Sequence, residues 1–330
     1  MVSTHSPHPQ QSGIAIDTRD IHVTYDDGTE AVTGVSLTVE NGEFFGFLGP
    51  NGAGKTTTIK TLVTLLYPTR GSVRINGYDT KSEPRRVRES IGYMAQETSI
   101  DLELTPRENL RTACEMYGVD QEHRDERIEE LLELVGLQDV AEERAETFSG
   151  GMKKRLDAAT VLVHQPPVVF LDEPTTGLDP EARLRVWEYF EKINDRGTTV
   201  FLTTQYLEEA DQLCDRLAIL EDGEIIASET PQTLKAATGM ETVRVRLADS
   251  QQRERARERL QSTDCGAIEQ TADGVAIKTA AAHSLTSEVI TALHEADISV
   301  ETVDIQTPTL DDVFLALTDS DAEIPAEVAR

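Results

Sequence analysis

The sequence predicts an α/β protein built around a mostly parallel sheet, followed by a smaller second domain. Three apolar runs of strand length, EFFGFLG, VVFLD (168–172) and TTVFLTT (198–204), alternate with segments of helical periodicity. Strands that alternate with helices are typical of parallel sheets, because each helix carries the chain back to start the next strand in the same direction. After about Lys235 the alternation begins again, which indicates a second domain.

The other elements follow from shorter patterns. IAIDTRDIHVTY and EAVTGVSLTVE carry β-branched residues and are bounded by DDG and ENG, which predicts strands joined by turns. Residues of about 102–165 have mostly helical periods, as in RIEELLELVGL. LAILEDGEIIASE predicts a hairpin around Asp222-Gly223. The last part of the chain predicts a β-α-β-α-β-α unit that ends in the helix LDDVFLALT.

The composition excludes several classes of protein. No stretch approaches the ~18–20 consecutive apolar residues of a membrane-spanning helix, and residues 1–13 lack the apolar core of a signal peptide. The three cysteines have no framework spacing, which predicts structural thiols in a reducing, intracellular setting. With 60 acidic and 31 basic residues, the chain is not expected to bind nucleic acid, which requires basic patches.

The net charge of −29 has two interpretations. One is a solvated acidic face on an ordinary protein. The other, which we favour because the acidic residues are spread over the whole chain, is adaptation to a cytoplasm of molar salt. At about 1 M salt the Debye length is only ~3 Å, so the repulsion that would destabilise the fold is screened.

We therefore expect the cooperative unfolding transition to be lost when salt is dialysed away. Thermal unfolding followed by circular dichroism in molar and in low salt would measure this. An equally cooperative transition at an unchanged temperature in low salt would contradict salt adaptation.

Residues 49–56, GPNGAGKT, fit the phosphate-binding pattern G-x-x-x-x-G-K-[ST] between a predicted strand and a predicted helix. Glycines allow backbone torsions that turn successive N–H groups toward phosphate oxygens, and the helix N-terminus adds about +0.5 of partial charge. Lys55 suits the β- and γ-phosphates, and the Thr56 hydroxyl suits Mg²⁺. The predicted nucleotide-binding residues are Gly49, Pro50, Asn51, Gly52, Ala53, Gly54, Lys55, Thr56 and Thr57.

Two acidic residues, Asp172 and Glu173, end the second buried strand. Parallel strands end at the same edge of a sheet, so these carboxylates are expected beside the phosphate loop. Asp172 is placed to hold Mg²⁺ through water, and Glu173 suits the base that polarises the attacking water. The alternative is an ordinary cap at the end of a strand.

Further motifs in the chain resemble those of a known protein family. From residue 14 to about 235 the chain resembles the ATP-binding subunits of ABC transporters. FSGGM (148–152) is similar to the family's signature LSGGQ, Gln96 to its Q-loop glutamine, and Asp179 in GLDP to its D-loop. Tyr25 falls where the family has an aromatic residue that stacks on adenine. No other class with a phosphate loop combines these motifs at these spacings.

The resemblance implies roles for these residues. The signature would open a helix near Met152 as an anion-binding terminus and clasp the γ-phosphate of ATP bound to a second subunit. One chain carries one phosphate loop and one signature, so a head-to-tail homodimer would enclose two ATP molecules. Gln96 would join Thr56 and Asp172 around Mg²⁺, although Gln96 could be a surface residue and Tyr25 ordinary packing. The implied signature residues are Ser149, Gly150, Gly151 and Met152.

One position departs from the family. Gln205 stands where the family usually has a histidine that contacts the γ-phosphate. Glutamine can donate a hydrogen bond to phosphate but cannot carry a positive charge. Either ATP hydrolysis is slow, or Gln205 is the catalytic contact of a subgroup. The string TTQYLEEAD (203–211) and the end of the chain (307–317) resemble the daunorubicin-resistance type of drug-export ATPase, so we expect hydrolysis.

We expect the following organisation from the resemblance. Residues 1–13 are a disordered tail, 14–235 the nucleotide-binding domain with an antiparallel β subdomain and a helical subdomain at about 97–160, 236–318 a small accessory α+β domain, and 319–330 an acidic tail.

The function implied is an ATPase subunit that uses ATP and Mg²⁺ to power export of a drug- or lipid-like molecule through a separate membrane permease. It would work as a homodimer at the cytoplasmic face of the cell membrane. The alternatives are an importer ATPase and a soluble ABC ATPase acting on DNA or ribosomes, although no coiled-coil or zinc insertion is present.

Overall fold

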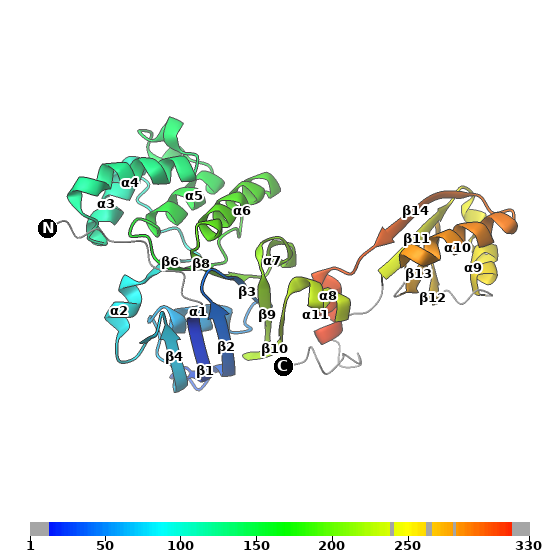
Figure 1. The fold of residues 1–330 in the computed structure, drawn as a ribbon, viewed down its shortest axis with the longest axis horizontal. Coiled ribbons are helices and arrows are strands. Elements are labelled where there is room, and N and C mark those ends of the chain that lie inside the picture. Colours follow the sequence, from blue (N-terminus) through cyan, green and yellow to red (C-terminus); the bar gives the residue numbers. More distant parts are fainter. Residues whose placement is uncertain (1–12, 238–240, 262–265, 280–281, 319–330) are drawn as a thin grey trace. The chain divides into compact units, whose positions relative to one another are not determined.

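The chain divides into two compact units between Thr230 and Pro231 (Figure 1). A computed structural model describes residues 13–237, 241–261, 266–279 and 282–318. Apart from Gly13, the tails predicted at 1–13 and 319–330 lie outside the described residues.

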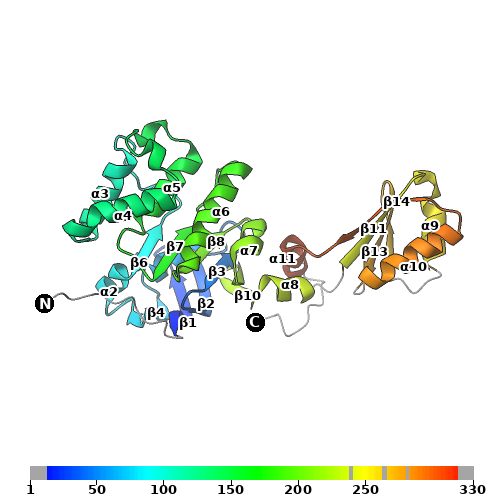
Figure 2. The same cartoon turned by 45° about the horizontal axis from the view of Figure 1, so that its top comes forward.

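A six-stranded sheet forms the centre of the first unit, in the order β10-β9-β3-β8-β7-β6 (Figure 2). Five strands run parallel, and β10 pairs antiparallel with β9 through the turn at Asp222-Gly223, as predicted. All residues of β3, β7 and β8 are buried, which explains their continuous apolar runs. The strands are β3 (Phe44–Leu48), β6 (Ile91–Met94), β7 (Val168–Asp172), β8 (Thr199–Thr204), β9 (Arg216–Glu221) and β10 (Glu224–Glu229). The predicted α/β fold is confirmed.

The register of the sheet brings two motifs to one edge. Leu48, the last residue of β3, pairs with Thr204, and Asp172, the last residue of β7, pairs with Thr203. The phosphate loop follows β3 and the two acidic residues end β7. Both therefore lie at the carboxyl edge of the sheet, where parallel α/β sheets bind ligands.

A core of aromatic rings lies beneath this edge. The ring centroids of Phe45, Phe47 and Phe170 each lie 5.6 Å from that of Phe201. The same core includes Ile59 of α1, which contacts both β7 and β8. The helices around the sheet are α1 (Lys55–Leu62), α6 (Pro180–Asp195) and α7 (Leu207–Leu213). The helix that follows the phosphate loop is thus fixed by apolar packing.

A second, antiparallel sheet has the order β2-β1-β4-β5. Its strands are β1 (Ile14–Thr24), β2 (Glu30–Glu40), β4 (Arg70–Ile75) and β5 (Tyr78–Asp79), followed by the short helix α2 (Pro84–Glu89). The first two strands match the predicted pair. The others were not predicted, because the short string RGSVRINGYD carries little alternation.

Three helices make up the segment in which helical periods were predicted: α3 (Pro106–Met116), α4 (Gln121–Leu134) and α5 (Gly150–Thr160). Thr105 and Glu108 form a reciprocal capping box at the start of α3. In α4, Ile128 and Leu131 lie on the buried face. Helix α5 begins at Gly150 rather than near Met152, so Ser149 is its N-cap and Gly150, Gly151 and Met152 lie in its first turn.

The second unit contains an antiparallel sheet of order β12-β13-β11-β14. Its elements are α8 (Pro231–Ala237), β11 (Glu241–Leu247), α9 (Arg253–Gln261), β12 (Ala267–Gln270), β13 (Gly274–Thr279), α10 (Ala282–Glu295), β14 (Val300–Gln306) and α11 (Leu310–Thr318). The predicted β-α-β-α-β-α order was wrong in omitting β12. That strand has only one residue, Ile268, packed on the core, so it carries no periodic signal.

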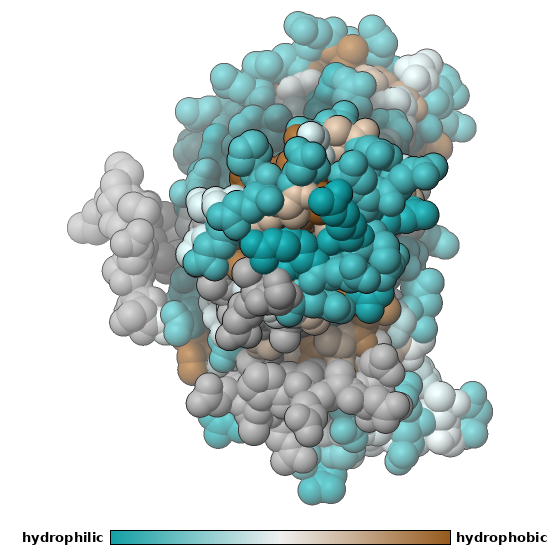
Figure 3. Space-filling view, turned by 90° about the vertical axis from the view of Figure 1, so that its right-hand side faces the viewer, coloured by the Kyte–Doolittle hydropathy of each residue, from teal (hydrophilic) through white to brown (hydrophobic). Residues whose placement is uncertain are grey.

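The described residues contain no helix that is long and apolar enough to span a membrane. Hydrophilic residues cover most of the face shown in Figure 3, and apolar residues appear there only in separate areas.

Candidate functional site

Two glycines of the phosphate loop are required by close backbone packing. A Cβ atom at Gly49 would lie 2.3 Å from the carbonyl oxygen of Leu220, and one at Gly54 would lie 2.3 Å from that of Ala31. Gly54 also has a φ of +104° and stands directly before α1. The loop crest at 50–52 is exposed. The loop therefore lies tightly on the sheet and presents its crest, and the N-terminus of α1, to a ligand.

Lys55 lies inside this loop with 4% of its surface exposed. Its Nζ donates to the carbonyl oxygens of Gly49 at 2.7 Å and Pro50 at 3.1 Å, and lies 3.4 Å from Oε1 of Glu173. A buried ammonium is stable only with such partners. The loop thus holds a positive charge where the phosphates of a nucleotide would lie.

Asp172 is held by a neighbour that was not predicted. Oγ1 of Thr203 donates to Oδ1 of Asp172 at 2.6 Å. Burial raises the pKa of Asp172, and the charge of Glu173 raises it further, whereas Thr203, Lys60 and Lys55 lower it. The two threonines that end the strand, Thr203 and Thr204, were the available signal, because a buried hydroxyl needs a partner.

Glu173 has a strained backbone and a fixed carboxylate. Its φ is +46°, a left-handed conformation that costs a non-glycine residue about 1–3 kcal/mol. Its N–H donates to the carbonyl oxygen of Thr203 at 3.0 Å and to Oγ1 of Thr203 at 3.1 Å. Its Oε2 accepts hydrogen bonds from Nε2 of Gln96 at 3.4 Å and Oγ1 of Thr176 at 3.3 Å. The sheet edge thus turns a nearly buried carboxylate toward Lys55 and Gln96.

The residues at this edge fit a magnesium ion that arrives with a nucleotide. Thr56 offers a hydroxyl, Asp172 a carboxylate, and Gln96 an amide oxygen, since its amide nitrogen faces Glu173. These are the hard oxygen ligands that Mg²⁺ prefers. The described residues contain no group of three or more His, Cys, Asp or Glu side chains that could hold a metal. A magnesium ion held here would take its remaining ligands from phosphate oxygens and water.

Tyr25 lies just beyond β1 and contacts the helix that follows the phosphate loop. Its hydroxyl is 2.9 Å from Oγ1 of Thr57. The side chain is 40% exposed, so it is not buried strand packing. Its stacking on adenine stays a prediction.

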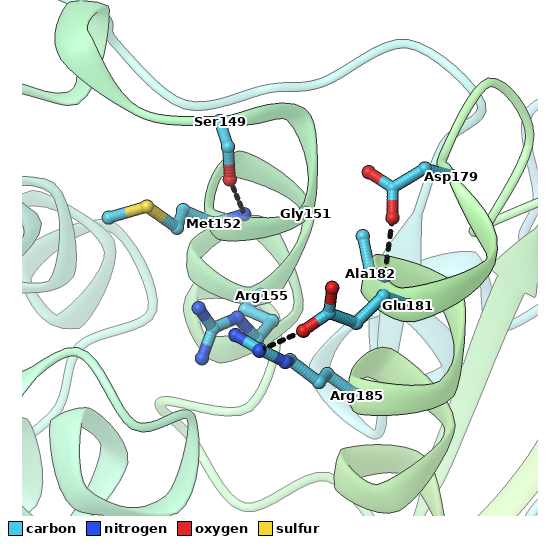
Figure 4. A pocket seen from close by; sticks show the side chains of 8 residues that line it. All are labelled: Ser149, Gly151, Met152, Arg155, Asp179, Glu181, Ala182 and Arg185. Carbon is cyan, nitrogen blue, oxygen red and sulfur yellow. Dashed lines mark hydrogen bonds and ion pairs between the residues drawn. The ribbon is translucent and has the colours of Figure 1, made fainter.

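The signature residues Ser149, Gly151 and Met152 line a pocket of about 230 Å³, called here the signature pocket (Figure 4). Oγ of Ser149 accepts the N–H of Met152 at 3.3 Å and caps α5, and Oδ1 of Asp179 accepts the N–H of Ala182 at 2.9 Å and caps α6. A Cβ at Gly151 would lie 2.9 Å from that of Ala182, so the two helices meet at a glycine. The pocket is lined by Ser149, Gly151, Met152, Arg155, Asp179, Glu181, Ala182 and Arg185.

Two arginines of this pocket were not predicted. Arg155 donates to the carbonyl oxygen of Val135 at 2.8 Å and the hydroxyl of Tyr189 at 3.0 Å, and Arg185 pairs with Glu181. Asp179 caps α6 and Glu181 offsets the charge of Arg185, so the groups that favour an anion here are Arg155 and the positive end of α5. The signal for Arg155 was its spacing, since a residue four positions after Gly151 lies on the same helix face.

Gln205 is the predicted site residue with the weakest support. It is exposed and comes directly after β8, at the same sheet edge as Asp172. In the described part of the chain, no hydrogen bond joins it to Lys55 or Glu173. Its predicted contact with the γ-phosphate stays a prediction.

Comparisons with known proteins agree with this geometry. Residues 32–176 match the family model described as ABC transporter. The chain is 42% identical over 311 residues to the daunorubicin/doxorubicin resistance ATP-binding protein DrrA of Streptomyces peucetius, covering 94% of each chain. It is also 42% identical over 219 residues to the Nod factor export ATP-binding protein I of Burkholderia lata, covering 66% of this chain and 72% of that one.

A solved structure shares the fold. It is a dimeric ATP-binding cassette in a post-hydrolysis state bound to ADP and phosphate, with a TM-score of 0.59 and 28% identity over 65% of this chain and 98% of that one. Together with the phosphate loop, the acidic strand end and the signature pocket, these similarities show that the chain belongs to the ABC transporter family, as an ATP-binding protein that hydrolyses ATP.

Proposed function

We propose that this ATPase powers export through a separate membrane permease by closing head to tail with a second copy of itself. One observation carries the proposal. The signature pocket is lined by residues of α5, α6 and their caps, and by none of the phosphate-loop residues. The positive terminus of α5 is therefore available to a nucleotide held by another subunit.

In this arrangement Ser149, Gly150, Gly151 and Met152 of one subunit would contact the γ-phosphate held by Lys55 of the other. The signature would touch nucleotide only in the closed dimer, which gives ATP its differential affinity for that state. The N-terminus of α5 and Arg155 at the pocket support a triphosphate as the ligand. A related cassette was solved as a dimer bound to ADP and phosphate.

Hydrolysis would use the residues at the sheet edge. Glu173, nearly buried and held by the Thr203 backbone, would orient the attacking water and accept its proton. Mg²⁺, held through Thr56, Gln96 and Asp172, would neutralise charge on the β- and γ-phosphates. Gln205 would donate a hydrogen bond to the γ-phosphate, and Tyr25 would stack on the adenine.

Relatives suggest the transported class. One is named for resistance to daunorubicin and doxorubicin, and another for Nod factor export. We infer that this chain serves export of an amphipathic, drug- or lipid-like molecule. The permease would supply the membrane-spanning segments and hold this chain at the cytoplasmic face. The second unit, which begins at Pro231 and contains the predicted domain of residues 236–318, would act as an accessory domain. We expect no nucleic acid among the partners.

Partner dependence tests the proposal. We expect the chain expressed alone to stay in the supernatant after ultracentrifugation at molar salt, and to sediment with membranes when co-expressed with a permease of about six spans encoded beside its gene. Inverted vesicles from the co-expressing cells should then accumulate daunorubicin when ATP is added, followed by quenching of its fluorescence.

The control is the same pair carrying Glu173→Gln, which should sediment with membranes but not accumulate daunorubicin. Sedimentation that does not depend on the permease would contradict the proposed partnership. Accumulation that does not depend on ATP would contradict its role in powering export.

A further inference from the structure

Helix α5 carries a buried lysine that bonds to the backbone of the Q-loop. Lys154 is 7% exposed, and its Nζ donates to the carbonyl oxygen of Gln96 at 2.7 Å. Burial lowers the pKa of Lys154, while the charges of Asp157 and Asp172 oppose that shift. The side chain therefore reaches from the signature helix to a residue that contacts Glu173.

One turn further along α5, Asp157 makes a second contact to the same segment. It is fully buried, and its Oδ1 accepts the N–H of Ser99 at 3.2 Å and the hydroxyl of Ser99 at 2.6 Å. Its Oδ2 is buried without a hydrogen-bond partner. Residues three apart share a helix face, so Lys154 and Asp157 hold positions 96 and 99 from one side.

Burying the charged groups of Lys154 and Asp157 costs free energy, which argues that they have a role beyond packing. Buried charged groups are often no more stabilising than apolar residues of similar volume, so their value can lie in fixing one arrangement. Here Lys154 and Asp157 fix residues 96–99, a segment that follows β6 and is exposed at both anchored positions. Without them, little packing would hold this segment against α5.

We propose that Lys154 and Asp157 are positioning residues that set Gln96 against Glu173 from the signature helix. Helix α5 starts at the cap Ser149 and carries Lys154, which donates a hydrogen bond to the carbonyl oxygen of Gln96. The side-chain amide of Gln96 in turn donates to Oε2 of Glu173 at 3.4 Å. A shift of α5 on meeting the second subunit's nucleotide thus moves Gln96 at this subunit's own site. The inference rests on the proposed roles of Gln96 and Glu173.

The test is the steady-state ATPase activity of Lys154→Met at molar salt. We expect kcat to fall roughly ten- to hundredfold, as for other losses of positioning, with ATP affinity nearly unchanged. Lys154→Arg, which keeps a donor for the Gln96 carbonyl, should restore most of the rate. The matched control is Lys153→Met, on the next residue of the same helix, which should retain the wild-type kcat.

A double-mutant cycle shows whether Lys154 acts through Gln96. In a Gln96→Ala background, Lys154→Met should have little further effect on kcat, because the side chain that it positions is gone. Equal fold losses in both backgrounds, or an equal loss in Lys153→Met, would overturn the proposal.

Two further variants separate this proposal from a folding defect and from a failure of the proposed function. Ser99→Ala removes an exposed hydroxyl and should fold normally, yet lower kcat because Asp157 loses its shortest contact. An unchanged kcat in both Ser99→Ala and Lys154→Met would overturn the proposal. Glu173→Gln tests the function separately, since its loss of turnover does not depend on the result for Lys154.

Discussion

Replacing Glu173 with glutamine is expected to lower ATP turnover by about 10²–10⁴-fold, the usual contribution of a general base, while ATP binding is retained. Glutamine keeps the size of the side chain and its contacts with Gln96 and Thr176, but it cannot take a proton from water. The ammonium of Lys55, 3.4 Å from this group, would lose a negative neighbour, which favours a bound triphosphate. The variant should therefore accumulate as a closed, ATP-loaded dimer.

A phosphate-release assay measures the loss of turnover, and the molar mass in solution measures the trapping of the dimer. Phosphate release should be nearly abolished at molar salt, and light scattering should show twice the monomer mass with ATP but not with ADP. Glu188→Gln is the matched control, because it removes the same charge from an exposed position on α6. Rapid turnover by Glu173→Gln would contradict the assignment of the base, and a monomer in saturating ATP would contradict trapping.

Replacing Lys55 with methionine is expected to weaken binding of MgATP by about a hundredfold, since a hydrogen bond to a charged group contributes about 1.5–3 kcal/mol. Methionine keeps the length of the side chain but removes the charge that the loop encloses. The carbonyl oxygens of Gly49 and Pro50 would lose their donor, so the loop would also lose its fixed conformation. Turnover should fall with binding.

Displacement of a fluorescent ATP analogue, titrated in molar salt, would measure this affinity. Lys81→Met is the control, because Lys81 is exposed and loses the same charge at the surface. The unfolding temperature of each variant should be measured in parallel, so that loss of binding is separated from loss of fold. Wild-type affinity in a folded Lys55→Met variant would contradict the assigned role.

The parts of the site that could be predicted are those formed by residues consecutive in the sequence. GPNGAGKT encodes its own turn, its helix start and its charge within eight residues, so its chemistry is local. VVFLD predicts a buried strand, and an acidic residue at its end predicts a sheet-edge carboxylate. The threonine in the strand signals a buried hydroxyl that needs a partner, but its partner Asp172 could not be predicted, because it lies 31 positions away. The contact of Lys154 with Gln96, 58 positions away, could not be predicted for the same reason.

In the fold, too, some elements could be predicted from consecutive residues and others could not. The strands β3, β7 and β8 can be predicted from the sequence, because a strand buried on both faces is mostly apolar. Short strands at the edge of a sheet, such as β12, are set by pairing with a neighbour, and the pattern of four residues does not carry that information. The start of α5 at Gly150 was likewise decided by the capping contact of Ser149.

By itself, the sequence determined the class of fold, the phosphate loop and its lysine, the acidic pair, and the family. These depend on contacts between near neighbours in the chain, which composition and spacing record. Only the tertiary structure decided that Glu173 has a strained backbone held by Thr203, that Gln96 turns its amide toward Glu173, and that the signature helix reaches Gln96 through Lys154. Those features arise where strands and helices far apart in the chain are packed together, and each buried polar group takes the partner that packing provides.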